Sequence, residues 1–458
     1  MTESNNPTTA KKPRLSRGQA PLRLVPAGSW VALLVTWLIW IINAFDREVI
    51  LRLGPVISDH FDLTPEAWGT ITAVIFFALA VMGIPGSRMS DKHGVGWKRA
   101  WFQVPLVIGY NLLSAISGIR AIASNLVAFL LLRIGVNLGA GWGEPIGVSN
   151  TAEWWPKERR GFALGVHHTG YPVGALLSGL AVAWILGIFG QENWSYVFFV
   201  GLIMAIPVMA FWWWYSNQDR IDRTYRLINE RGMTVPVTQG DHDTHHEDQK
   251  GAVAACFRNK IVMLTSGTTL LTQIVYNGIS YTLPLYLAFI VGLDFASAAA
   301  FSVVFTITGV LGQIVWPTIS DYLGRRNTLI ITGTWMGLAA GAFYFAHSLE
   351  AYIGLQLFLG MVANAPWPIF YAAATDAAPR NASGTANGFI TTSMFIGGGL
   401  APLLIGALIA LGGGWNNVSG YNMAFILMMI SALIGVGLQL LIREPRLSFV
   451  TKNGGQAS

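Results

Sequence analysis

The chain has 458 residues, of which 53% are hydrophobic and only 11% are charged. Soluble domains carry about 25% charged residues, so this composition indicates a membrane protein and argues against a soluble enzyme. The net charge of +6 does not indicate nucleic-acid binding, because the lysines and arginines lie in loops between apolar segments. We therefore expect membrane lipid as the surroundings of the chain and no nucleic-acid partner.

Twelve segments approach the length of about 20 apolar residues that a membrane-spanning helix needs. In chain order they lie near 28–53, 66–88, 98–119, 122–148, 161–188, 194–215, 260–290, 296–319, 327–347, 350–374, 384–411 and 421–442. We expect an all-α membrane protein with two six-helix bundles. Its parts would be a tail (1–27), a bundle (28–215), a linker (216–258), a second bundle (259–443) and a second tail (444–458).

The loops predict the orientation of the chain in the membrane. Lysine and arginine gather in alternate loops, for example at Lys157–Arg160 and Arg220–Arg231, whereas Gly190–Asn193 and Gly412–Gly420 contain none. Because positively charged loops stay in the cytoplasm, both termini and the linker are predicted to be cytoplasmic. The composition and the absence of a targeting signal favour a bacterial inner membrane.

The two halves of the chain repeat each other. Ser90-Asp91 is followed by Gly94 and the cations Lys98-Arg99, and Ser320-Asp321 is followed by Gly324 and Arg325-Arg326. Pro156 precedes a Gly-x-Ala-x-Gly run that begins at Gly161, and Pro379 precedes the same run at Gly384. A duplicated half with charged turns between apolar spans is typical of a two-fold-repeat transporter.

Ionisable groups inside the spans are the first candidates for function, because they are costly in a membrane. Asp46 and Arg47 end the first span, and the fourth carries Arg133 and Glu144. An arginine stays charged and its donors match a carboxylate, so Arg47 and Arg133 are predicted to bind an anionic substrate. Membrane-embedded carboxylates serve as proton relays in transporters, so Asp46 and Glu144 are predicted to couple protons.

The remaining candidates are polar or aromatic. His167 and His168 in the fifth span exchange protons near neutral pH, and Tyr171 follows them. The second half has scarcely any charge in its spans, and polar or aromatic side chains replace it. We expect these to close over the uncharged part of a substrate: Gln273, Tyr276, Asn277, Tyr281, Asn364, Trp367 and Tyr371. Packing between helices is the alternative role for all of them.

The linker holds an Asp/His/Glu cluster at 241–248. No apolar framework surrounds it to fix ligand geometry, so we interpret it as a solvated segment and expect no metal site. No nucleophile elbow or phosphate-binding loop is present, which argues against an enzyme or a bound cofactor.

The repeated Asp91 and Asp321 blocks resemble the loop motif of the major facilitator superfamily, and the resemblance covers residues 28–443. It implies that Asp91, Arg99, Asp321 and Arg325 form a gate on one face. Ser87 and Pro317 stand where the motif usually has glycine, and Val95-Gly96-Trp97 lengthens the first copy, so the gate is expected to be modified.

A narrower resemblance is to the anion:cation symporter family. It rests on Asp46-Arg47, on Arg133, on the segment Ile57–Thr64 and on Trp154–Arg159. Members carry sugar acids, aromatic acids or other organic anions with protons or sodium. The family usually has a glutamate seven residues after the arginine of span four, where this chain has Ala140. Glu144, Asp46 or a histidine would then carry the proton.

The sequence therefore predicts a monomeric transporter that takes up a small organic anion with a proton or Na⁺ by alternating access. Organic anion exchange is one alternative. Efflux of an amphipathic or cationic compound is another, favoured by the run Gly170–Gly174 of the fifth span, but buried arginines argue against a cationic substrate.

Overall fold

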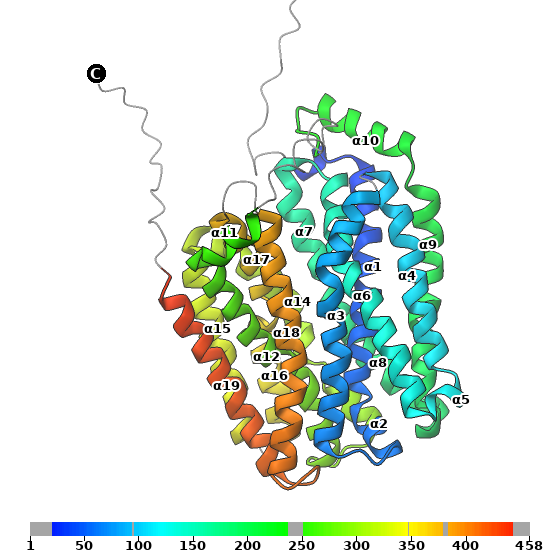
Figure 1. Ribbon diagram of the computed structural model, residues 1–458, viewed down its shortest axis with the longest axis vertical. Helices are drawn as coiled ribbons and strands as arrows, with labels where there is room; N and C mark the ends of the chain where they lie inside the picture. The colour runs from blue at the N-terminus through cyan, green and yellow to red at the C-terminus, as the bar shows by residue number, and fades with distance from the viewer. Residues whose placement is uncertain (1–20, 94–95, 237–250, 347, 379–382, 443–458) are drawn as a thin grey trace, which may run out of the picture. The chain divides into compact units, whose positions relative to one another are not determined.

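The computed structural model describes residues 21–93, 96–236, 251–346, 348–378 and 383–442. These residues form helices and turns, without a β-strand among them (Figure 1). Residues 21–236 contain α1 (Ala27–Arg52), α2 (Gly54–His60), α3 (Pro65–His93), α4 (Trp97–Ser117), α5 (Arg120–Ala123), α6 (Leu126–Trp154), α7 (Arg160–His168), α8 (Gly170–Phe189), α9 (Phe198–Tyr215) and α10 (Gln218–Glu230). Residues 251–442 contain α11 (Ala252–Arg258), α12 (Lys260–Phe289), α13 (Phe295–Phe301), α14 (Phe305–Leu323), α15 (Arg325–Ala342), α16 (Leu349–Ala363), α17 (Pro366–Ala377), α18 (Ser383–Leu411) and α19 (Val418–Leu440).

Eleven segments of the described chain are long and apolar enough to cross a membrane. They match the expected spans except the seventh, which is α12. This helix has 30 residues, which is ample for a bilayer, but it buries many polar side chains, among them Thr269, Gln273 and Asn277. The expected fold class, an all-α membrane protein with a duplicated set of spanning helices, is confirmed.

Three expected spans are each built from two helices, and one of these, the eighth, is α13 followed by α14. The fifth is α7 followed by α8, with Thr169 between them. Pro172 follows closely and has no N–H to donate to the carbonyl of His168, which weakens a continuous helix there. The tenth is α16 followed by α17, and Pro366 is the first residue of α17. Such breaks free backbone groups and are found where a membrane helix lines a cavity or is buried in protein.

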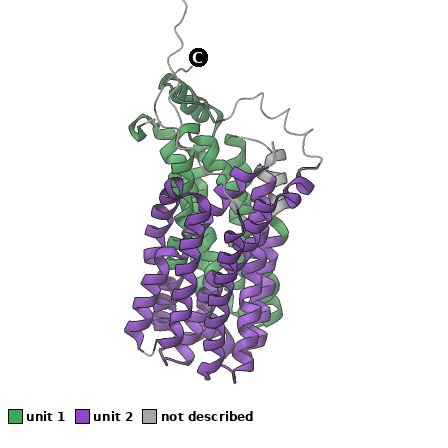
Figure 2. Ribbon diagram, turned by 90° about the vertical axis from the view of Figure 1, so that its left-hand side faces the viewer, with its two compact units in different colours: residues 1–48, 81–177, 195–246 green, residues 49–80, 178–194, 247–458 purple. Residues whose placement is uncertain are grey.

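The chain forms two compact units (Figure 2). Unit 1 comprises residues 1–48, 81–177 and 195–246, and unit 2 comprises 49–80, 178–194 and 247–458. Within unit 1, α4 packs against α6 and α9. Its core includes the buried rings of Tyr110, Trp154 and Trp212.

Unit 2 is organised around α12, which packs along α18 and α19. Short segments from the first half of the sequence also belong to this unit. They include the end of α1, all of α2 and the first half of α3.

The linker begins with an ordered amphipathic helix, α10. Ile221, Thr224 and Ile228 are buried on one face, at the spacing that defines a helical stripe. Helix α10 approaches α1 closely at Gly28, where a Cβ would lie 2.2 Å from Thr224 Oγ1. Beyond the helix, the guanidinium of Arg231 donates to the carbonyl of Leu24 at 2.9 Å. The first part of the linker is therefore fixed to unit 1.

Candidate functional site

Three buried side chains from α1, α4 and α6 form a hydrogen-bonded chain in unit 1. The Ser114 hydroxyl donates to Asp46 Oδ1 at 2.8 Å. The Arg133 guanidinium donates from Nη1 to Ser114 Oγ at 3.0 Å and from Nη2 to the Asp46 carbonyl at 2.6 Å. Asp46 and Arg133 are both fully buried. Ser114 thus connects a carboxylate and a cation that stand 87 positions apart in sequence.

Helix α9 closes over this chain. The Phe198 ring lies 4.7 Å from the Arg133 guanidinium carbon, a distance at which a ring face attracts a cation. A Cβ on Gly201 would lie 2.9 Å from Asp46 Oδ1, so the glycine leaves room for the carboxylate in this position. Among the described residues, Asp46 Oδ2 and Arg133 Nε have no hydrogen-bond partner. Each therefore retains one polar atom for a proton, water or ligand.

The next residues of α1 form a second polar group in unit 1. Arg47 lies over the ring of Tyr171, 5.1 Å from its centroid. The Tyr171 hydroxyl donates to Glu48 Oε1 at 2.7 Å. All three residues come from the broken fifth span or the end of the first span. Glu48 was missed by the sequence analysis, although it directly follows two residues that were singled out.

The two histidines have different surroundings. His167 stacks on Trp40 with ring centroids 5.7 Å apart, and its Nδ1 lies 3.4 Å from the Thr151 hydroxyl. His168 Nδ1 instead lies 2.7 Å from the Leu164 carbonyl, one turn back along α7. His168 is therefore tied to its own helix, whereas His167 belongs to a network between helices.

The candidates of the second half lie in unit 2. Gln273 donates to Asn277 at 3.0 Å, and Asn277 donates to the Gly398 carbonyl at 3.2 Å. The Tyr276 and Trp367 rings meet edge to face with centroids 6.0 Å apart. These contacts join α12 to α17 and α18.

The other candidates of this half are less connected. Asn364, at the break between α16 and α17, is fully buried, and neither atom of its amide has a partner among the described residues. Tyr281 is also buried, and its hydroxyl has no described partner. Tyr371 Oη lies 3.0 Å from Thr391 Oγ1. Buried amides of this kind are satisfied by water or a ligand.

Three of the gating candidates form ion pairs, two of them with each other, and two partners, Glu153 and Asp376, were not among the candidates. Arg99 binds Glu153 of α6, with Nη2 2.7 Å from Oε1, and the Gly96 N–H donates to the same carboxylate at 2.9 Å. In unit 2, Arg325 pairs with Asp321 at 2.6 Å and faces Asp376 at 3.6 Å. Glu153 stands three residues before Pro156, and Asp376 stands three before Pro379. The repeat therefore held the signal for both partners.

Two carboxylates of the sequence analysis lie outside the described side chains. Asp91 is in α3 and Glu144 is in α6, and the structure describes the backbone of both but neither side chain. The linker cluster at 241–248 also lies outside the described residues. Within the described part of the chain, no group of three or more His, Cys, Asp or Glu residues is placed to hold a metal ion.

Helix α10 covers the Arg99–Glu153 pair. The Tyr225 hydroxyl donates to the Glu153 carbonyl at 3.0 Å. Burial and the negative charge of Glu153 raise the pKa of Tyr225, so the phenol keeps its proton. The Thr234 N–H donates to the Glu158 carboxylate at 3.0 Å, and Lys157 N–H donates to the Thr234 carbonyl at 3.1 Å.

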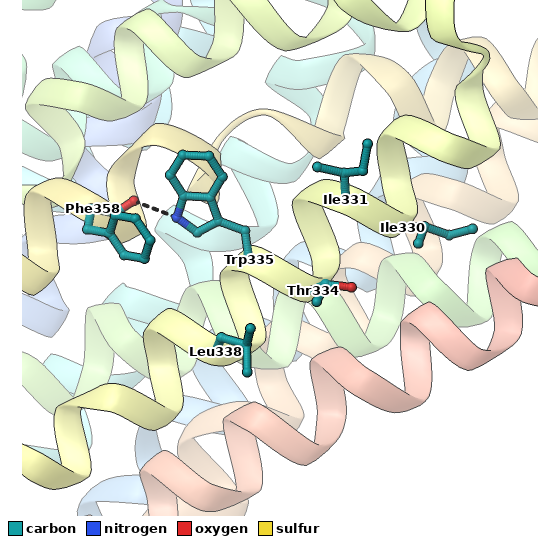
Figure 3. A pocket seen from close by; sticks show the side chains of 6 residues that line it. All are labelled: Ile330, Ile331, Thr334, Trp335, Leu338 and Phe358. Atoms are coloured by element: carbon teal, nitrogen blue, oxygen red, sulfur yellow. Dashed lines mark hydrogen bonds between the residues drawn. The ribbon is translucent and has the colours of Figure 1, made fainter.

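An apolar groove of about 400 Å³ lies on α15 and α16 in unit 2 (Figure 3). Its lining is Ile330, Ile331, Thr334, Trp335, Leu338 and Phe358. The Trp335 N–H donates to the Phe358 carbonyl at 3.1 Å, so the one ring donor is already occupied (Figure 3). The groove offers no charged group to an anion, and its walls are helices of membrane-spanning length.

Comparison with known proteins shows which family has this architecture. The family model described as Major Facilitator Superfamily matches residues 36–303 and again 265–456. A gentisate transporter of Corynebacterium glutamicum is 23% identical over 92% of this chain and 89% of its own length. A cis,cis-muconate transport protein of Acinetobacter baylyi is 23% identical, covering 83% of this chain and 88% of its own.

A third relative and two solved structures are also similar to this chain over most of its length. A hexuronate transporter of Bacillus subtilis is 22% identical over 82% of this chain and 87% of its own. Among solved structures, the xylose transporter of E. coli in an inward-open conformation superposes with a TM-score of 0.70 at 15% identity, covering 92% of this chain and 98% of that one. A bacterial homologue of the human lysosomal transporter Spinster, inward-facing and unoccupied, gives 0.70 at 17% identity, with 91% and 97% covered.

Proposed function

Because the chain belongs to the Major Facilitator Superfamily and is a multi-pass membrane transporter rather than an enzyme, we propose that it takes up a small organic anion together with a proton. The names of three relatives support the substrate class, since gentisate, muconate and hexuronates are all carboxylates. The observation that carries the coupling is the buried chain from Asp46 through Ser114 to Arg133.

In this proposal Asp46 carries the proton. The ionised carboxylate accepts from Ser114 and attracts Arg133, and burial strengthens that attraction because little water screens it. A proton on Asp46 removes its charge and weakens the hold on the guanidinium. Arg133 then offers its donors to the carboxylate of the substrate, so binding of the anion and uptake of the proton favour each other.

The remaining binding candidates have a separate role in each half of the chain. Arg47, His167, His168 and Tyr171 face the charged end of the anion. The amides and rings of the second half contact its uncharged part, with the Tyr276–Trp367 contact and the unpartnered Asn364 amide supporting that role. Glu144 is kept as a second proton-coupling candidate.

Because the two halves of the chain repeat each other, each half is proposed to supply one part of the gate and one helical bundle. Asp91 and Arg99 of the first half and Asp321 and Arg325 of the second are the cytoplasmic gate, now extended by Glu153 and Asp376. The bundles 28–215 and 259–443 are the two moving bodies of a monomer that works by alternating access. Both termini lie in the cytoplasm of a bacterial inner membrane.

Uptake into proteoliposomes tests this function. Labelled gentisate, muconate and glucuronate are offered with and without an inward proton gradient, and with a sodium gradient in its place. We expect accumulation of at least one anion that needs the proton gradient and collapses with an uncoupler. Counterflow without gradient-driven accumulation would instead establish an exchanger. Protection of an expressing strain against toxic cations, without anion uptake, would establish efflux.

A variant separates coupling from binding. Asp46→Asn keeps the size of the side chain but cannot carry the proton, so gradient-driven accumulation should be lost while counterflow persists. Asp219→Asn, on the exposed face of α10, is the matched control and should behave as the parent. Full accumulation by Asp46→Asn would remove Asp46 from the mechanism.

A further inference from the structure

Helices α1 and α4 carry a polar stripe inside unit 1. Its members on α4 are Gln103, Tyr110 and Asn111, and its members on α1 are Thr36 and Asn43. These residues are at most 2% exposed. Residues seven or eight positions apart lie on one face of a helix, so the side chains follow each helix along its axis. The stripe therefore runs lengthwise through the unit.

Several buried polar atoms on or beside this stripe have no hydrogen-bond partner among the described residues. They are Asp46 Oδ2, Asn111 Oδ1, Tyr110 Oη, Asn43 Oδ1, Gln103 Nε2 and His167 Nε2. A buried polar group that stays unpaired is destabilising, and such groups are commonly satisfied by ordered water. Their succession along one stripe indicates a series of water sites rather than isolated ones.

One end of the series is the carboxylate of Asp46. A Cβ on Gly201 would stand 2.7 Å from Asn111 Oδ1 and 3.1 Å from Asp46 Oδ2, so these two oxygens face the same small space. Asn111 is held in this direction because its Nδ2 donates to the Val107 carbonyl at 2.9 Å. Either oxygen of a protonated carboxyl can carry the hydrogen, which at Oδ2 is donated toward Asn111.

Tyr110 and Asn43 continue the series toward α6. The Tyr110 hydroxyl lies beside the side chains of Asn43 and Asn111. Asn43 Nδ2 donates to the Ala140 carbonyl at 3.0 Å, which leaves its Oδ1 for another partner. A tyrosine hydroxyl both donates and accepts a hydrogen bond, as water does. Tyr110 can therefore stand in the series in the place of a water molecule.

Two glycines of α6 leave space for the next step. A Cβ on Gly143 would lie 2.8 Å from Asn43 Nδ2. A Cβ on Gly147, one turn further along, would lie 3.4 Å from His167 Nε2 and 3.8 Å from Gln103 Nε2. One helical turn is about 5.4 Å, which is about the length of two consecutive hydrogen bonds. A water molecule bonded on both sides spans this distance.

His167 is the group at the other end that can hold a proton. Its Nδ1 lies 3.4 Å from the Thr151 hydroxyl, and that hydroxyl donates to a backbone carbonyl of α6 at 2.9 Å. In this arrangement Nδ1 carries the hydrogen and Nε2 keeps a lone pair. The His168 ring lies 5.5 Å away, but its Nδ1 is bound to its own helix. Nε2 of His167 is therefore the open acceptor.

We propose that this stripe is a file of water sites along which the proton passes between Asp46 and His167. The proton leaves Asp46 Oδ2, the waters and the Tyr110 hydroxyl each take up one hydrogen and pass one on, and His167 Nε2 accepts it. Asp46 is left ionised and His167 becomes an imidazolium, so charge is conserved. His167 stands seven residues after Arg160, in a loop predicted to be cytoplasmic, so the file leads toward the cytoplasm.

This inference rests on the proposed coupling through Asp46, and it adds a route for the proton alone inside unit 1. Radiolytic labelling of the full-length protein detects the water directly, because hydroxyl radicals formed from ordered water oxidise the side chains beside it. We expect Tyr110 to be oxidised about tenfold faster than Tyr421, since ordered water lies at the first hydroxyl only. Tyr421 is also buried, but its hydroxyl donates to the Trp415 carbonyl at 3.0 Å. Equal rates at the two tyrosines would overturn the file.

A methyl group at Gly147 tests the transfer. In Gly147→Ala the Cβ would meet His167 and Gln103 at ordinary contact distances, so the variant should fold, but the methyl occupies the space between the two Nε2 atoms. Proton-driven uptake into proteoliposomes should become about tenfold slower, part of the 10²–10⁴ that a positioned proton-transfer group contributes. Counterflow needs no net proton transfer and should stay at the parent rate, and the final accumulation should also be unchanged.

The matched control is Gly109→Ala on α4, where a Cβ would have no neighbour within 4 Å. It should transport as the parent does. Tyr110→Phe, which removes the relaying hydroxyl, should slow proton-driven uptake as Gly147→Ala does. Parent rates in both Gly147→Ala and Tyr110→Phe would remove the file.

The outcomes separate this inference from the proposed function. Loss of accumulation by Asp46→Asn, together with parent rates in Gly147→Ala and Tyr110→Phe, would keep the coupling and remove the file. If the parent accumulates no anion, the proposed function fails. The labelling of Tyr110 against Tyr421 needs no substrate, so it then decides by itself whether the water file is kept or removed.

Discussion

The two halves of the chain share one helical plan but place charge differently. Three other pairs of residues are separated in sequence by the same number of positions as Pro156 and Pro379. They are Asn125 and Ser348, Arg133 and Gln356, and Glu153 and Asp376. Asn125 caps α6 by accepting from the Ala128 N–H at 3.1 Å, and Ser348 caps α16 by accepting from Ala351 at 3.2 Å. The caps are equivalent, so the two helices start alike.

Further along these helices the halves diverge. Arg133 is buried and binds Ser114 and the Asp46 carbonyl. Gln356 is equally buried, but neither atom of its amide has a partner among the described residues. A helix at this position therefore folds without a cation. The buried cation of α6 thus has no charged counterpart in α16, which agrees with the role proposed for Arg133.

The ion pairs of the two halves differ in burial. Arg99 and Glu153 are 4% and 8% exposed, whereas Arg325 and Asp376 are 26% and 66% exposed. Exposed pairs contribute little to stability because water and salt screen them. The first half thus holds its pair under α10, and the second leaves its pair in solvent.

The largest effect is expected when the first half is made like the second. Arg133→Gln leaves the Asp46 carboxylate buried without its cation, and loss of one partner of a buried pair costs about 3 kcal/mol. Denaturation of the purified protein in detergent measures the loss, and uptake should fall with it. Adding Asp46→Asn should recover much of the stability, whereas additive losses would show that the two groups are not coupled.

The next effect separates the two ion pairs. Glu153→Gln removes the charged acceptor of Arg99 and of the Gly96 N–H, so we expect a loss of about 2 kcal/mol in the free energy of unfolding. Asp376→Asn should change it by about 0.5 kcal/mol or less. The same denaturation assay measures both. Similar losses for the two variants would contradict the difference in burial as its cause.

A smaller effect of opposite sign is expected at Gln356. Gln356→Met removes a buried amide without a described partner, and we expect a gain of about 1 kcal/mol because that amide is costly to bury. Gln439→Met is the control, since Gln439 is also buried but donates to Thr268 at 2.9 Å. It should lose stability. A loss at Gln356 as well would indicate that a water or ligand satisfies its amide.

The smallest difference is expected at the caps. Asn125→Ala and Ser348→Ala should each cost about 1 kcal/mol, the usual cost of removing an N-cap side chain. Thermal unfolding of the two variants, with Asn125→Ser and Ser348→Asn as conservative partners, measures it. Unequal costs would mean that the halves differ already at the starts of these helices.

The fold was largely predictable because long apolar runs and charged turns determine it. The breaks in the fifth and tenth spans were not predicted, although Pro172 and Pro366 held a signal. The amphipathic pattern of α10 was present within the polar linker, at Ile221 and Ile228. Its attachment to unit 1 depends on contacts with distant residues such as Gly28, which no local pattern shows.

The candidate site was predictable where charge interrupts an apolar span. Asp46, Arg47 and Arg133 stand out in the sequence for that reason. The hydrogen bonds that connect Asp46 to Arg133 cannot be predicted in this way, because they depend on the packing of α1, α4 and α6. Ser114 carries no signal, since serines are common in membrane helices. Glu153 could have been predicted, because it occupies the position in the first repeat that Asp376 occupies in the second.

Ser114 has one proton and two lone pairs, and this fixes the direction of the bonds around it. With Asp46 ionised, donation runs from Arg133 to Ser114 and on to Asp46. A protonated Asp46 becomes a donor, so the hydroxyl accepts from both sides and its own proton turns to a third acceptor. A threonine hydroxyl at this position can reverse the direction of its hydrogen bonds in the same way, whereas alanine has no hydroxyl. In the proposed coupling, the Ser114 hydroxyl therefore transmits the protonation of Asp46 to Arg133.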